Sequence, residues 1–599
     1  MLVVYYHCCV CGYIGHFSKE EIDTDKLFNA NSLITCRGPD QTIQKSQSNT
    51  FYKTNYSFIF NRLSIVDLSS GGEQPMYSNI YKTTLLFNGE IYNHRELRIL
   101  LEKDGVKFMS SHSDSEVVLL GLSHYGEKFI EKMVGQFAIV FYDHKDNTVL
   151  LVKDRLAQKP LYYLKEKKDF IFSSNLLSIV KYKNIKLSDK SIIDYLNFGV
   201  VPSPQTLFEN IFKLEPAEIV KIDLKSDNLS KSIYWRLNEL IGNKKYNEEQ
   251  FKNLLSDSIN IRQDADVDIA HFLSGGLDST YIIKNLEKKR QDTNTYSVGF
   301  DDTRYDETRW QKEVVEKYKT NHMYSKISTD LGFDIIDETI KAFDEPYADS
   351  STIPSYLISR DISQKYKVAI SGDGGDELLG GYTRFINSLK KTKGLNLSSL
   401  YSIYPATFGS GLELMRTSND IYKSYPYEFA DLKLLDILKL ESFRSIYDLV
   451  EFTGEDITKD LMMIEYRYYL SELMMLKIDR TSMANSLEIR SPFVDHRLIE
   501  YVFGHKLNFD NHLGKKHFKD DLLKDFNHEF VNREKQGFSF QVESWVYQNI
   551  ELVRELINNG KVINQIDKKI IDKLSLVKSR TNGGRIWKLF FLERFLSSL

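Results

Sequence analysis

The chain has 599 residues, which is long for a single domain, so two or more domains are expected. Hydrophobic residues make up 42% and charged residues 27%, and the formal net charge of -4 argues against a basic, nucleic-acid-binding protein. No apolar run approaches the roughly 20 residues of a membrane span. All the cysteines lie near the amino terminus, at Cys8, Cys9, Cys11 and Cys36. A disulfide framework is therefore excluded for the rest of the chain, and a reducing cytoplasm is expected.

The first landmark is Cys11. The segment 10–17 predicts a short strand that buries Tyr13 or Ile14 and presents Cys11 at its start. Four polar stretches follow, at 36–40, 61–67, 87–93 and 113–116. Together with the thiol they supply the groups needed to bind an amino acid and attack its side-chain carbonyl.

Each of these groups has a chemical task and a simpler alternative. Arg62 can hold a carboxylate bidentately, or it is a surface charge. Asp114 can hold an ammonium group, or it caps a helix. Asn88 and the Gly89 N–H can form an oxyanion hole, or the pair makes a hairpin turn between 84–87 and 91–92. Cys11 itself could be a buried apolar residue, as free cysteines often are.

In this order the stretches resemble the class II glutamine amidotransferase domain. That domain has an N-terminal-nucleophile fold, an α+β sandwich of two stacked antiparallel sheets between helices. The resemblance extends from Cys11 to about residue 175 and includes 136–138 and 153–156. We expect the domain to span 11–220.

The resemblance also implies the roles of the residues. Cys11 attacks the amide carbon of glutamine, and Arg62 holds the substrate carboxylate. Asn88 and the N–H of Gly89 stabilise the oxyanion. The amino group of glutamine is held by two acidic residues, Asp114 and Glu90. The products are glutamate and ammonia.

One feature departs from the family pattern. The family's nucleophilic cysteine is the first residue of the mature chain, because its α-amine serves as the general base. Here residues 1–10 precede Cys11, and an amide nitrogen cannot accept a proton. We expect a misplaced start, with the Val10 codon read as Met; a cleaved propeptide and an inactive glutaminase are the alternatives. A metal cluster at the start, with His7, Cys8, Cys9 and Cys11 as its ligands, is a further alternative that we do not favour.

The middle of the chain is less informative. Segment 187–222 predicts short strands and turns, and the polar stretch 223–231 predicts a surface connection. A second domain is expected over 232–599. Within it, a helix over 247–262 leads towards a glycine-rich loop.

That loop, 274–280, follows an apolar strand at 269–273 and precedes a helix at 280–286. Strand, glycine-rich turn and helix start form a geometry that cradles phosphate. Asp278 beside a phosphate implies an intervening Mg²⁺ ion. The loop differs from the Gly-x-x-x-x-Gly-Lys-Ser/Thr pattern and resembles that of the pyrophosphate-releasing ATPases, which transfer AMP. A plain Gly-Gly turn is the alternative.

After the loop, strands and helices alternate. The expected strands are 295–300, 322–327 and 367–370, and the expected helices are 309–319 and 331–343. This order predicts an α/β, doubly wound parallel sheet with ligands at the carboxyl ends of its strands. A second glycine-rich loop, 371–377, follows the last strand. Asp278 and Asp376 are therefore expected to converge on one Mg²⁺–phosphate group, the alternative for this loop being a flexible acidic turn.

Three further stretches carry charge within apolar sequence, at 344–351, 476–484 and 488–495. Buried charges need partners, although helix caps and a solvated helical face are simpler explanations. A loop at 535–538 carries Lys535.

The segment from about 251 to 596 resembles the synthetase domain of glutamine-hydrolysing asparagine synthetases, an ATP-pyrophosphatase fold. By this resemblance, the backbone at Val298 contacts the ATP adenosine, as does the loop Ser371-Gly372. Asp373 supports acyl-adenylate formation, and Lys535 stabilises negative charge. Pyrophosphate is held by the first loop, including Ser274, Gly275, Gly276, Asp278 and Ser279, and Mg²⁺ by Asp278 and Asp376.

The expected reaction is an ATP-dependent and glutamine-dependent amidation of a carboxylate, with L-aspartate as the expected acceptor. Another carboxylate, such as a sugar uronate or a small peptide, is the alternative among enzymes. A binding or regulatory protein with a lost glutaminase is the alternative of another class. Ammonia must stay neutral to react, so a tunnel between the sites is expected. The expected partners are small molecules, with no nucleic acid or membrane, and a homodimer is left open.

Overall fold

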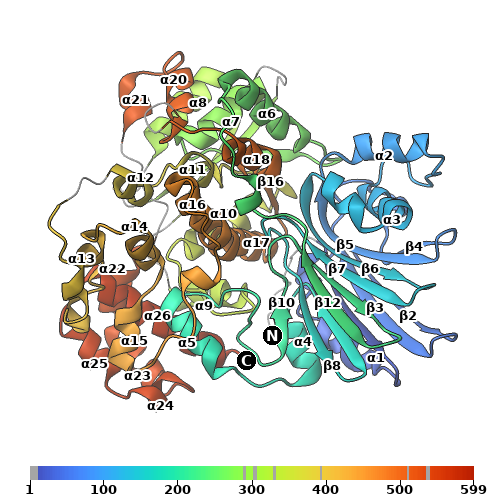
Figure 1. The fold of residues 1–599 in the computed structure, drawn as a ribbon, viewed down its shortest axis with the longest axis horizontal. Coiled ribbons are helices and arrows are strands. Elements are labelled where there is room, and N and C mark those ends of the chain that lie inside the picture. The colour runs from blue at the N-terminus through green and yellow to red at the C-terminus, as the bar shows by residue number, and fades with distance from the viewer. Residues whose placement is uncertain are drawn as a thin grey trace.

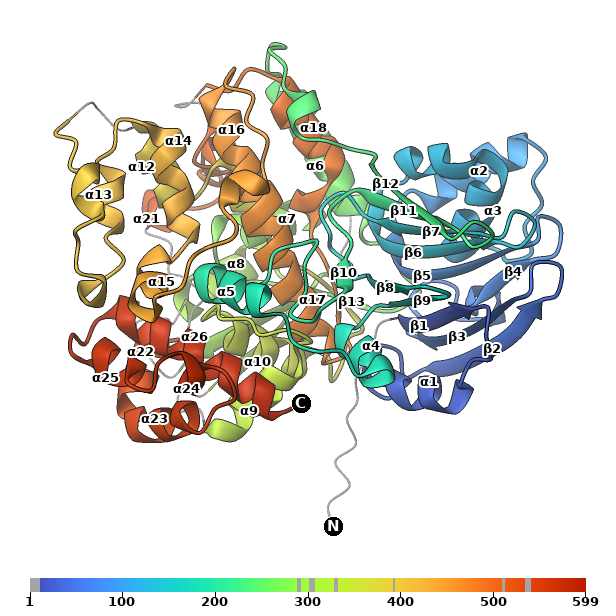
Figure 2. The ribbon, with the colours of Figure 1, turned by 60° about the horizontal axis from the view of Figure 1, so that its bottom comes forward.

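A computed structural model describes residues 11–287, 292–300, 307–327, 332–390, 394–508, 512–533 and 540–599. The N-terminal half is a stack of two sheets, drawn in blue to green on the right of Figure 1. The second half is mostly helical and surrounds a smaller sheet (Figures 1 and 2). The predictions made for residues 1–10 and for Lys535 lie outside the described residues.

The N-terminal half consists of two six-stranded antiparallel sheets. The first has the order β10-β8-β9-β1-β3-β2. Its strands are β1 (Gly12–Ser18), β2 (Gln41–Asn49), β3 (Thr54–Arg62), β8 (Tyr162–Glu166), β9 (Asp169–Ser173) and β10 (Ile211–Lys213). The second has the order β12-β11-β7-β6-β5-β4. Its strands are β4 (Met76–Ser78), β5 (Thr83–Ile91), β6 (Gly135–Asp143), β7 (Thr148–Lys153), β11 (Glu218–Asp223) and β12 (Asn228–Ile233).

Alternation along the strands explains the layers. Tyr13 and Phe17 of β1 face the second sheet and pack in the core between the sheets. Ile14, between them, faces outward to helices α1 (Thr24–Asn31) and α4 (Leu176–Lys183). The outer face of the second sheet is covered by α2 (His94–Lys103) and α3 (Asp114–Tyr125). The predicted sandwich of two antiparallel sheets between helices is confirmed.

Two local predictions in this half are wrong. Segment 187–222 contains a helix, α5 (Asp189–Phe198), capped by the Ser188 side chain and ended by Gly199 at φ 81°. The polar stretch 223–231 is exposed, as expected, but residues from 228 onward form β12, which pairs with β11 as an edge strand. Polar side chains on an edge strand protect it from further pairing, so they did not signal a strand.

The second half is organised by a five-stranded parallel sheet of order β15-β14-β13-β16-β17. Its strands are β13 (Ile269–Phe272), β14 (Asn294–Phe300), β15 (Asn321–Ile327), β16 (Val368–Ile370) and β17 (Glu488–Arg490). The helices of its first part are α6 (Glu248–Ile261), α7 (Leu277–Glu287), α8 (Thr308–Tyr318), α9 (Phe333–Lys341) and α10 (Thr352–Ile362).

Both faces of this sheet are covered. Ala270 packs with Ile362 of α10, whereas its neighbour Ile269 packs in the main core with Ile282 of α7. The chain leaves β13 for β14 and β15 and then returns to β16 on the other side of β13. The order therefore reverses between β13 and β16, which is where ligands bind in doubly wound sheets. The predicted parallel fold is confirmed.

The remaining helices form the C-terminal part of this half. They are α11 (Gly375–Leu379), α12 (Thr383–Lys390), α13 (Leu412–Arg416), α14 (Ile421–Ser424), α15 (Leu432–Leu438), α16 (Ile457–Ile464), α17 (Met475–Met483), α18 (His496–Gly504), α20 (Lys516–Leu522), α21 (His528–Asn532), α22 (Val542–Gln548), α23 (Ile550–Asn558), α24 (Ile563–Ile566), α25 (Ile570–Ser575) and α26 (Arg580–Ser597). A π-helical segment, Glu465–Met474, joins α16 to α17, which lies along the boundary between the halves (Figure 2). Within the described ranges, no helix is long and apolar enough to cross a bilayer.

Candidate active sites

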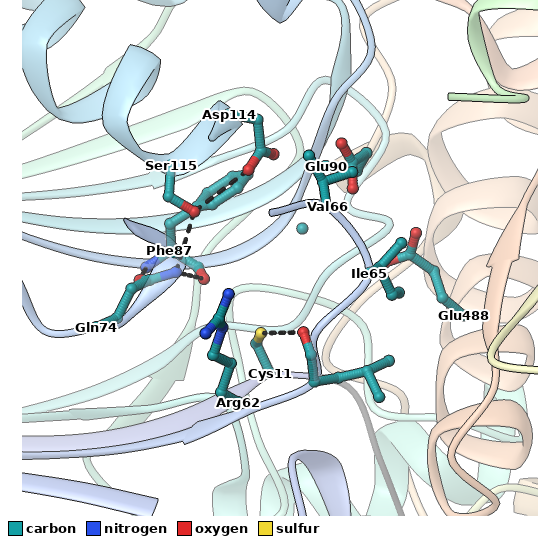
Figure 3. Close-up of a pocket in the computed structure, with 13 residues that line it drawn as sticks. Cys11, Arg62, Ile65, Val66, Gln74, Phe87, Glu90, Asp114, Ser115 and Glu488 are labelled. Atoms are coloured by element: carbon teal, nitrogen blue, oxygen red, sulfur yellow. Dashed lines mark hydrogen bonds between the residues drawn. The ribbon is translucent and has the colours of Figure 1, made fainter. Parts of the chain in front are cut away.

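A pocket at the amino-terminal end of β1 brings together the predicted glutaminase residues other than Asn88, which does not line it. Cys11 lies just before β1, Arg62 ends β3, and Asp114 begins α3. Gly89 and Glu90, from β5, complete the predicted part of the lining. Figure 3 shows the Cys11 thiol and the Arg62 guanidinium on one side of the pocket, with the Asp114 and Glu90 carboxylates across from them. Arg62 is buried, so the surface-charge alternative is wrong.

The Asn88–Gly89 pair lies inside a continuous strand, because β5 pairs with β6 along its whole length. The hairpin-turn alternative is therefore wrong. Asn88 is fully buried, and among the described residues its side-chain nitrogen and oxygen have no hydrogen-bond partner. Gly89 has φ 146°, and a Cβ there would lie 2.0 Å from the Gln136 carbonyl oxygen, so only glycine fits. A buried, unpartnered amide beside a glycine suits the expected oxyanion hole.

Two buried carboxylates face the same space. Burial raises the pKa of Glu90 well above its ordinary value, and the charge of Asp114 raises it further. Burial likewise raises the pKa of Asp114. Such a pair is stabilised by a cation placed between them, as the α-ammonium of an amino acid would be. Ser113, not Asp114, caps α3, so the capping alternative for Asp114 is wrong.

The Cys11 thiol makes no hydrogen bond to a side chain in the described part of the chain. Its Sγ donates a hydrogen bond to the Leu63 carbonyl at 3.7 Å, and burial raises the pKa of the thiol to about 12. None of the described residues that line the pocket is histidine or lysine. The nearby His16 contacts Tyr182 and Asp169 instead, at 3.0 and 3.2 Å. No histidine or lysine of the described lining can therefore act as the base, which agrees with the expectation of an α-amine.

Three polar residues of this pocket have no predicted role from the sequence, namely Gln74, Ser115 and Glu488. Gln74 holds the backbone of Phe87, accepting from its N–H at 2.6 Å and donating to its carbonyl at 3.2 Å. The Gln74 Nε2 also donates to Ser115 at 3.3 Å. Glu488 reaches the pocket from β17 of the second half (Figure 3). Only the charged run at 488–495 signalled this last residue.

The second candidate site is built on the loop between β13 and α7. Gly275 has φ 75°, and the Ser274 hydroxyl accepts from the Gly276 N–H at 3.2 Å and lies 3.1 Å from the Ser279 hydroxyl. The bare N–H groups at the start of α7 follow directly. Asp278 is the second residue of that helix. This arrangement fits the expected phosphate cradle.

The loop after β16 lies directly against Asp278. A Cβ on Gly375 would be 2.8 Å from the Asp278 Cγ, and one on Gly372 would be 3.0 Å from its Cβ. The nitrogen of Lys515 lies 2.5 Å from carboxylate oxygens of both Asp278 and Asp376. The two acidic residues therefore converge as expected. Two carboxylates plus substrate phosphates are a usual Mg²⁺ environment, so these residues fit the ion.

Lys515 is a residue of this site that the sequence does not predict. Its backbone is in the left-handed region at φ 61°, just before α20, and its side chain is buried. The only signal was a lysine-rich stretch, which is usually exposed. Holding a non-glycine residue in this conformation costs free energy, as is common at functional sites.

The remaining predicted ATP contacts lie at the same end of the sheet. Val298 is in β14, where its carbonyl accepts from Gln311 at 3.1 Å. Ser371, Gly372 and Asp373 follow β16 directly. Their nucleotide contacts stay a prediction.

The three charged stretches of the second half form the boundary with the first half. Asp479 of α17 pairs with Arg37, and Arg480 pairs with Asp344 at 2.8 Å. All four side chains are buried, so the solvated-face alternative is wrong. Lys213 of the first half pairs with Glu345 at 2.7 Å. The stretches position the two halves against each other.

Comparisons with known proteins agree with this architecture. A family model described as asparagine synthase matches residues 250–596, and one described as glutamine amidotransferase domain matches 10–235. A putative asparagine synthetase [glutamine-hydrolyzing] 2 of Methanocaldococcus jannaschii is 32% identical over 75% of this chain and 88% of that protein. Asparagine synthetase [glutamine-hydrolyzing] 1 of Bacillus subtilis is 28% identical over 96% and 95%. Amidase chry2 of Gibberella zeae is 24% identical over 90% and 88%.

A thiol pocket on an N-terminal-nucleophile sandwich, joined to a parallel sheet with two glycine-rich acidic loops, defines a glutamine-dependent amidating enzyme. The chain belongs to the asparagine synthase family.

Proposed function

We propose that the protein converts L-aspartate, L-glutamine, ATP and water to L-asparagine, L-glutamate, AMP and pyrophosphate. The observation that supports this most is the presence of two separate sites in one chain. One holds the Cys11 thiol with two carboxylates, and the other holds Asp278 and Asp376 on facing loops.

In the first site, Cys11 attacks the amide carbon of glutamine. Arg62 holds the α-carboxylate, and Asn88 with the Gly89 N–H stabilises the oxyanion. Glu90 and Asp114 hold the amino group. Ammonia leaves, and water then releases glutamate from the thioester.

In the second site, the aspartate side-chain carboxylate attacks the α-phosphorus of ATP, which gives an acyl-AMP and pyrophosphate. Oxide is a poor leaving group and AMP a good one, so this step activates the carboxyl carbon. Residues 274–279 hold the pyrophosphate, and the backbone at Val298 with Ser371 and Gly372 holds the adenosine. Lys515 offsets the charge of the two carboxylates.

Asp278 and Asp376 would hold Mg²⁺, which supplies charge neutralisation on the phosphates when bound. Asp373 supports formation of the acyl-AMP. Lys535, which lies outside the described residues, is proposed to stabilise negative charge in this step and in ammonia attack.

Ammonia then attacks the acyl carbon. Ammonium is not a nucleophile, so we propose a closed passage between the sites that keeps ammonia neutral. Holding the partners together lowers the barrier because their translational entropy is already lost. We further propose that the reaction takes place in the cytoplasm.

The decisive assay measures pyrophosphate release with ATP, each candidate carboxylate, and either glutamine or ammonium. Aspartate is expected to give the highest rate. A second acceptor class, a sugar uronate or small peptide, stays open, because one relative is named an amidase and not an asparagine synthetase. ATP binding without any pyrophosphate release would instead indicate a binding protein.

A further inference from the structure

Arg490, on the edge strand of the second half, contacts Glu90 in the lining of the glutamine pocket of the first half. Its Nη2 lies 3.0 Å from Glu90, and its Nε lies 2.7 Å from Glu488, two residues earlier on the same face of β17. Its Nη1 donates to the carbonyls of Arg262 and Asp264, at 3.1 and 2.8 Å. The side chain is fully buried. Every nitrogen of the guanidinium is thus engaged, and its position is fixed.

The backbone of the same residue touches the other site. The Arg490 carbonyl accepts a hydrogen bond from the Ser371 N–H at 3.0 Å. The neighbouring Ser491 hydroxyl lies 3.0 Å from the Ser371 hydroxyl. Ser371 begins the loop proposed above to contact the ATP adenosine. Arg490 therefore contacts a proposed glutamine-binding residue, Glu90, through its side chain, and the proposed nucleotide-binding loop through its backbone.

We propose that Arg490 is a positioning residue for the glutamine site, which holds Glu90 in place and links glutamine binding to nucleotide binding at Ser371. The proposal rests on the proposed function, because it uses both sites. Glu90 is surrounded by the like charges of Asp114, Glu488 and Asp264, and Arg490 is the cation that opposes them. Removing Arg490 would raise the pKa of Glu90 further and would weaken its hold on an ammonium group. Coupling of this kind is reciprocal.

The test measures glutamine binding by calorimetry in the full-length chain carrying Cys11→Ala, so that no turnover occurs. Adding Arg490→Met is expected to weaken glutamine binding at least about tenfold, the size expected when one partner of a buried charge pair is removed. Arg490→Lys keeps the charge but cannot reach all its partners, so a smaller loss is expected.

The second readout is the effect of nucleotide. Magnesium with a non-hydrolysable ATP analogue should change the glutamine Kd of the parent by about fivefold, within the usual range of coupling between sites. The Arg490→Met variant should lose this change.

Arg585→Met is the matched control, because Arg585 is also buried and pairs bidentately with Asp431, at 2.6 and 2.8 Å. Its partners lie among the C-terminal helices and the turns between them, and in neither candidate site. It is expected to lower thermal stability without changing the glutamine Kd.

The proposal is overturned if Arg490→Met binds glutamine as the parent does, or if the nucleotide effect is absent in the parent or survives in the variant. Should the Met variant not fold, the Arg490→Lys variant is compared with the parent instead, and a smaller loss of glutamine binding is expected for it. Ammonia-dependent pyrophosphate release by the chain with Cys11 intact is measured in parallel. Its absence would count against the proposed function and not against the placement of Arg490.

Discussion

Arg37 and Asp479, 442 positions apart, form a bidentate ion pair in which both N–O distances are 2.9 Å. Burial by itself would raise the pKa of Asp479, but Arg37, Arg480 and Lys159 together hold that pKa below its ordinary value. The carboxylate is thus kept ionised inside the boundary between the halves. The pair fixes their relative position.

This pair belongs to a longer series of alternating charges. Lys159 lies 3.9 Å from both Asp479 and Glu488. Glu488 pairs with Arg490, which pairs with Glu90 in the thiol pocket. Removing one member leaves an uncompensated buried charge, which typically costs about 3–5 kcal/mol. The boundary is therefore expected to resist sliding, which suits a closed passage for ammonia.

Cys11→Ala is expected to abolish glutamine hydrolysis and to leave ammonia-dependent pyrophosphate release unchanged. The reason is that the thiol and the acidic loops lie in different halves of the molecule. Glutamate and pyrophosphate are measured separately on the same preparation. Loss of both activities in a folded variant would contradict the two-site assignment.

Asp278→Asn and Asp376→Asn are each expected to lower pyrophosphate release by roughly a hundredfold or more, because each removes a charge that would hold the metal and the phosphates. Lys515→Met should also lower it, by about tenfold or more, since a preorganised charge is lost. Glutamine hydrolysis should persist in all three.

The neighbouring Lys516 supplies the control for these variants. It is exposed and pairs only with Asp520 among its described ion pairs. Lys516→Met should keep full pyrophosphate release. Equal rates for the two lysine variants would remove Lys515 from the site.

The base for Cys11 can be tested by comparing two chains. A chain that starts at Cys11 has a free α-amine, whose pKa of about 8 leaves a useful fraction neutral near pH 7–8. A chain with residues 1–10 attached has an amide there and a thiol whose pKa is about 12. The first should hydrolyse glutamine, and the second should be nearly inactive.

Alkylation by iodoacetamide gives an independent readout. In the longer chain, modification of Cys11 should still rise with pH above pH 10, since little thiolate forms below that pH. Mass spectrometry verifies that the first ten residues are attached. Equal glutamine turnover by the two chains would argue for a different base.

The loss of stability on acidification should depend in part on Glu472. Burial alone would raise the pKa of Glu472, but Arg467 and Lys213, with a hydrogen bond from Ser203, lower it to about 2. A folded-state pKa below the ordinary 4.5 stabilises the protein above about pH 4.5, and this contribution is lost as pH falls towards 2. The difference between these two pKa values corresponds to about 3 kcal/mol of folding free energy.

Thermal unfolding of the Glu472→Gln variant tests the direction of this pH dependence. The variant should melt well below the wild type at pH 7, and the difference should shrink as the pH is lowered from 5 to 3. A difference that stays constant over this range would show that Glu472 does not titrate as described.

The elements that carry a strong local pattern could be predicted from the sequence. The predicted bounds of the strand, loop and helix around Ser274 agree with the structure within a few residues. An apolar run, two glycines and a helical period all point to the same elements there. The convergence of Asp278 and Asp376 followed from the parallel order alone, since the carboxyl ends of adjacent strands share one edge.

What could not be predicted depends on distant contacts. β17 has only three residues and becomes a strand because Ile370 and its neighbours pair with it. Lys515 and Glu488 are ordinary charged residues until the fold brings them against other loops. Gln74 lies outside the strands and acts through the backbone of β5, for which no local signal exists.

The central claim is that a carboxylate attacks the α-phosphorus of ATP. It is tested most directly with L-aspartate carrying isotopically labelled oxygen in its side-chain carboxylate, incubated with ATP and glutamine or ammonium. Mass spectrometry of the nucleotide should show AMP with one labelled oxygen, formed in equal amount to asparagine and pyrophosphate. Formation of ADP and phosphate, or of AMP without label, would contradict the mechanism.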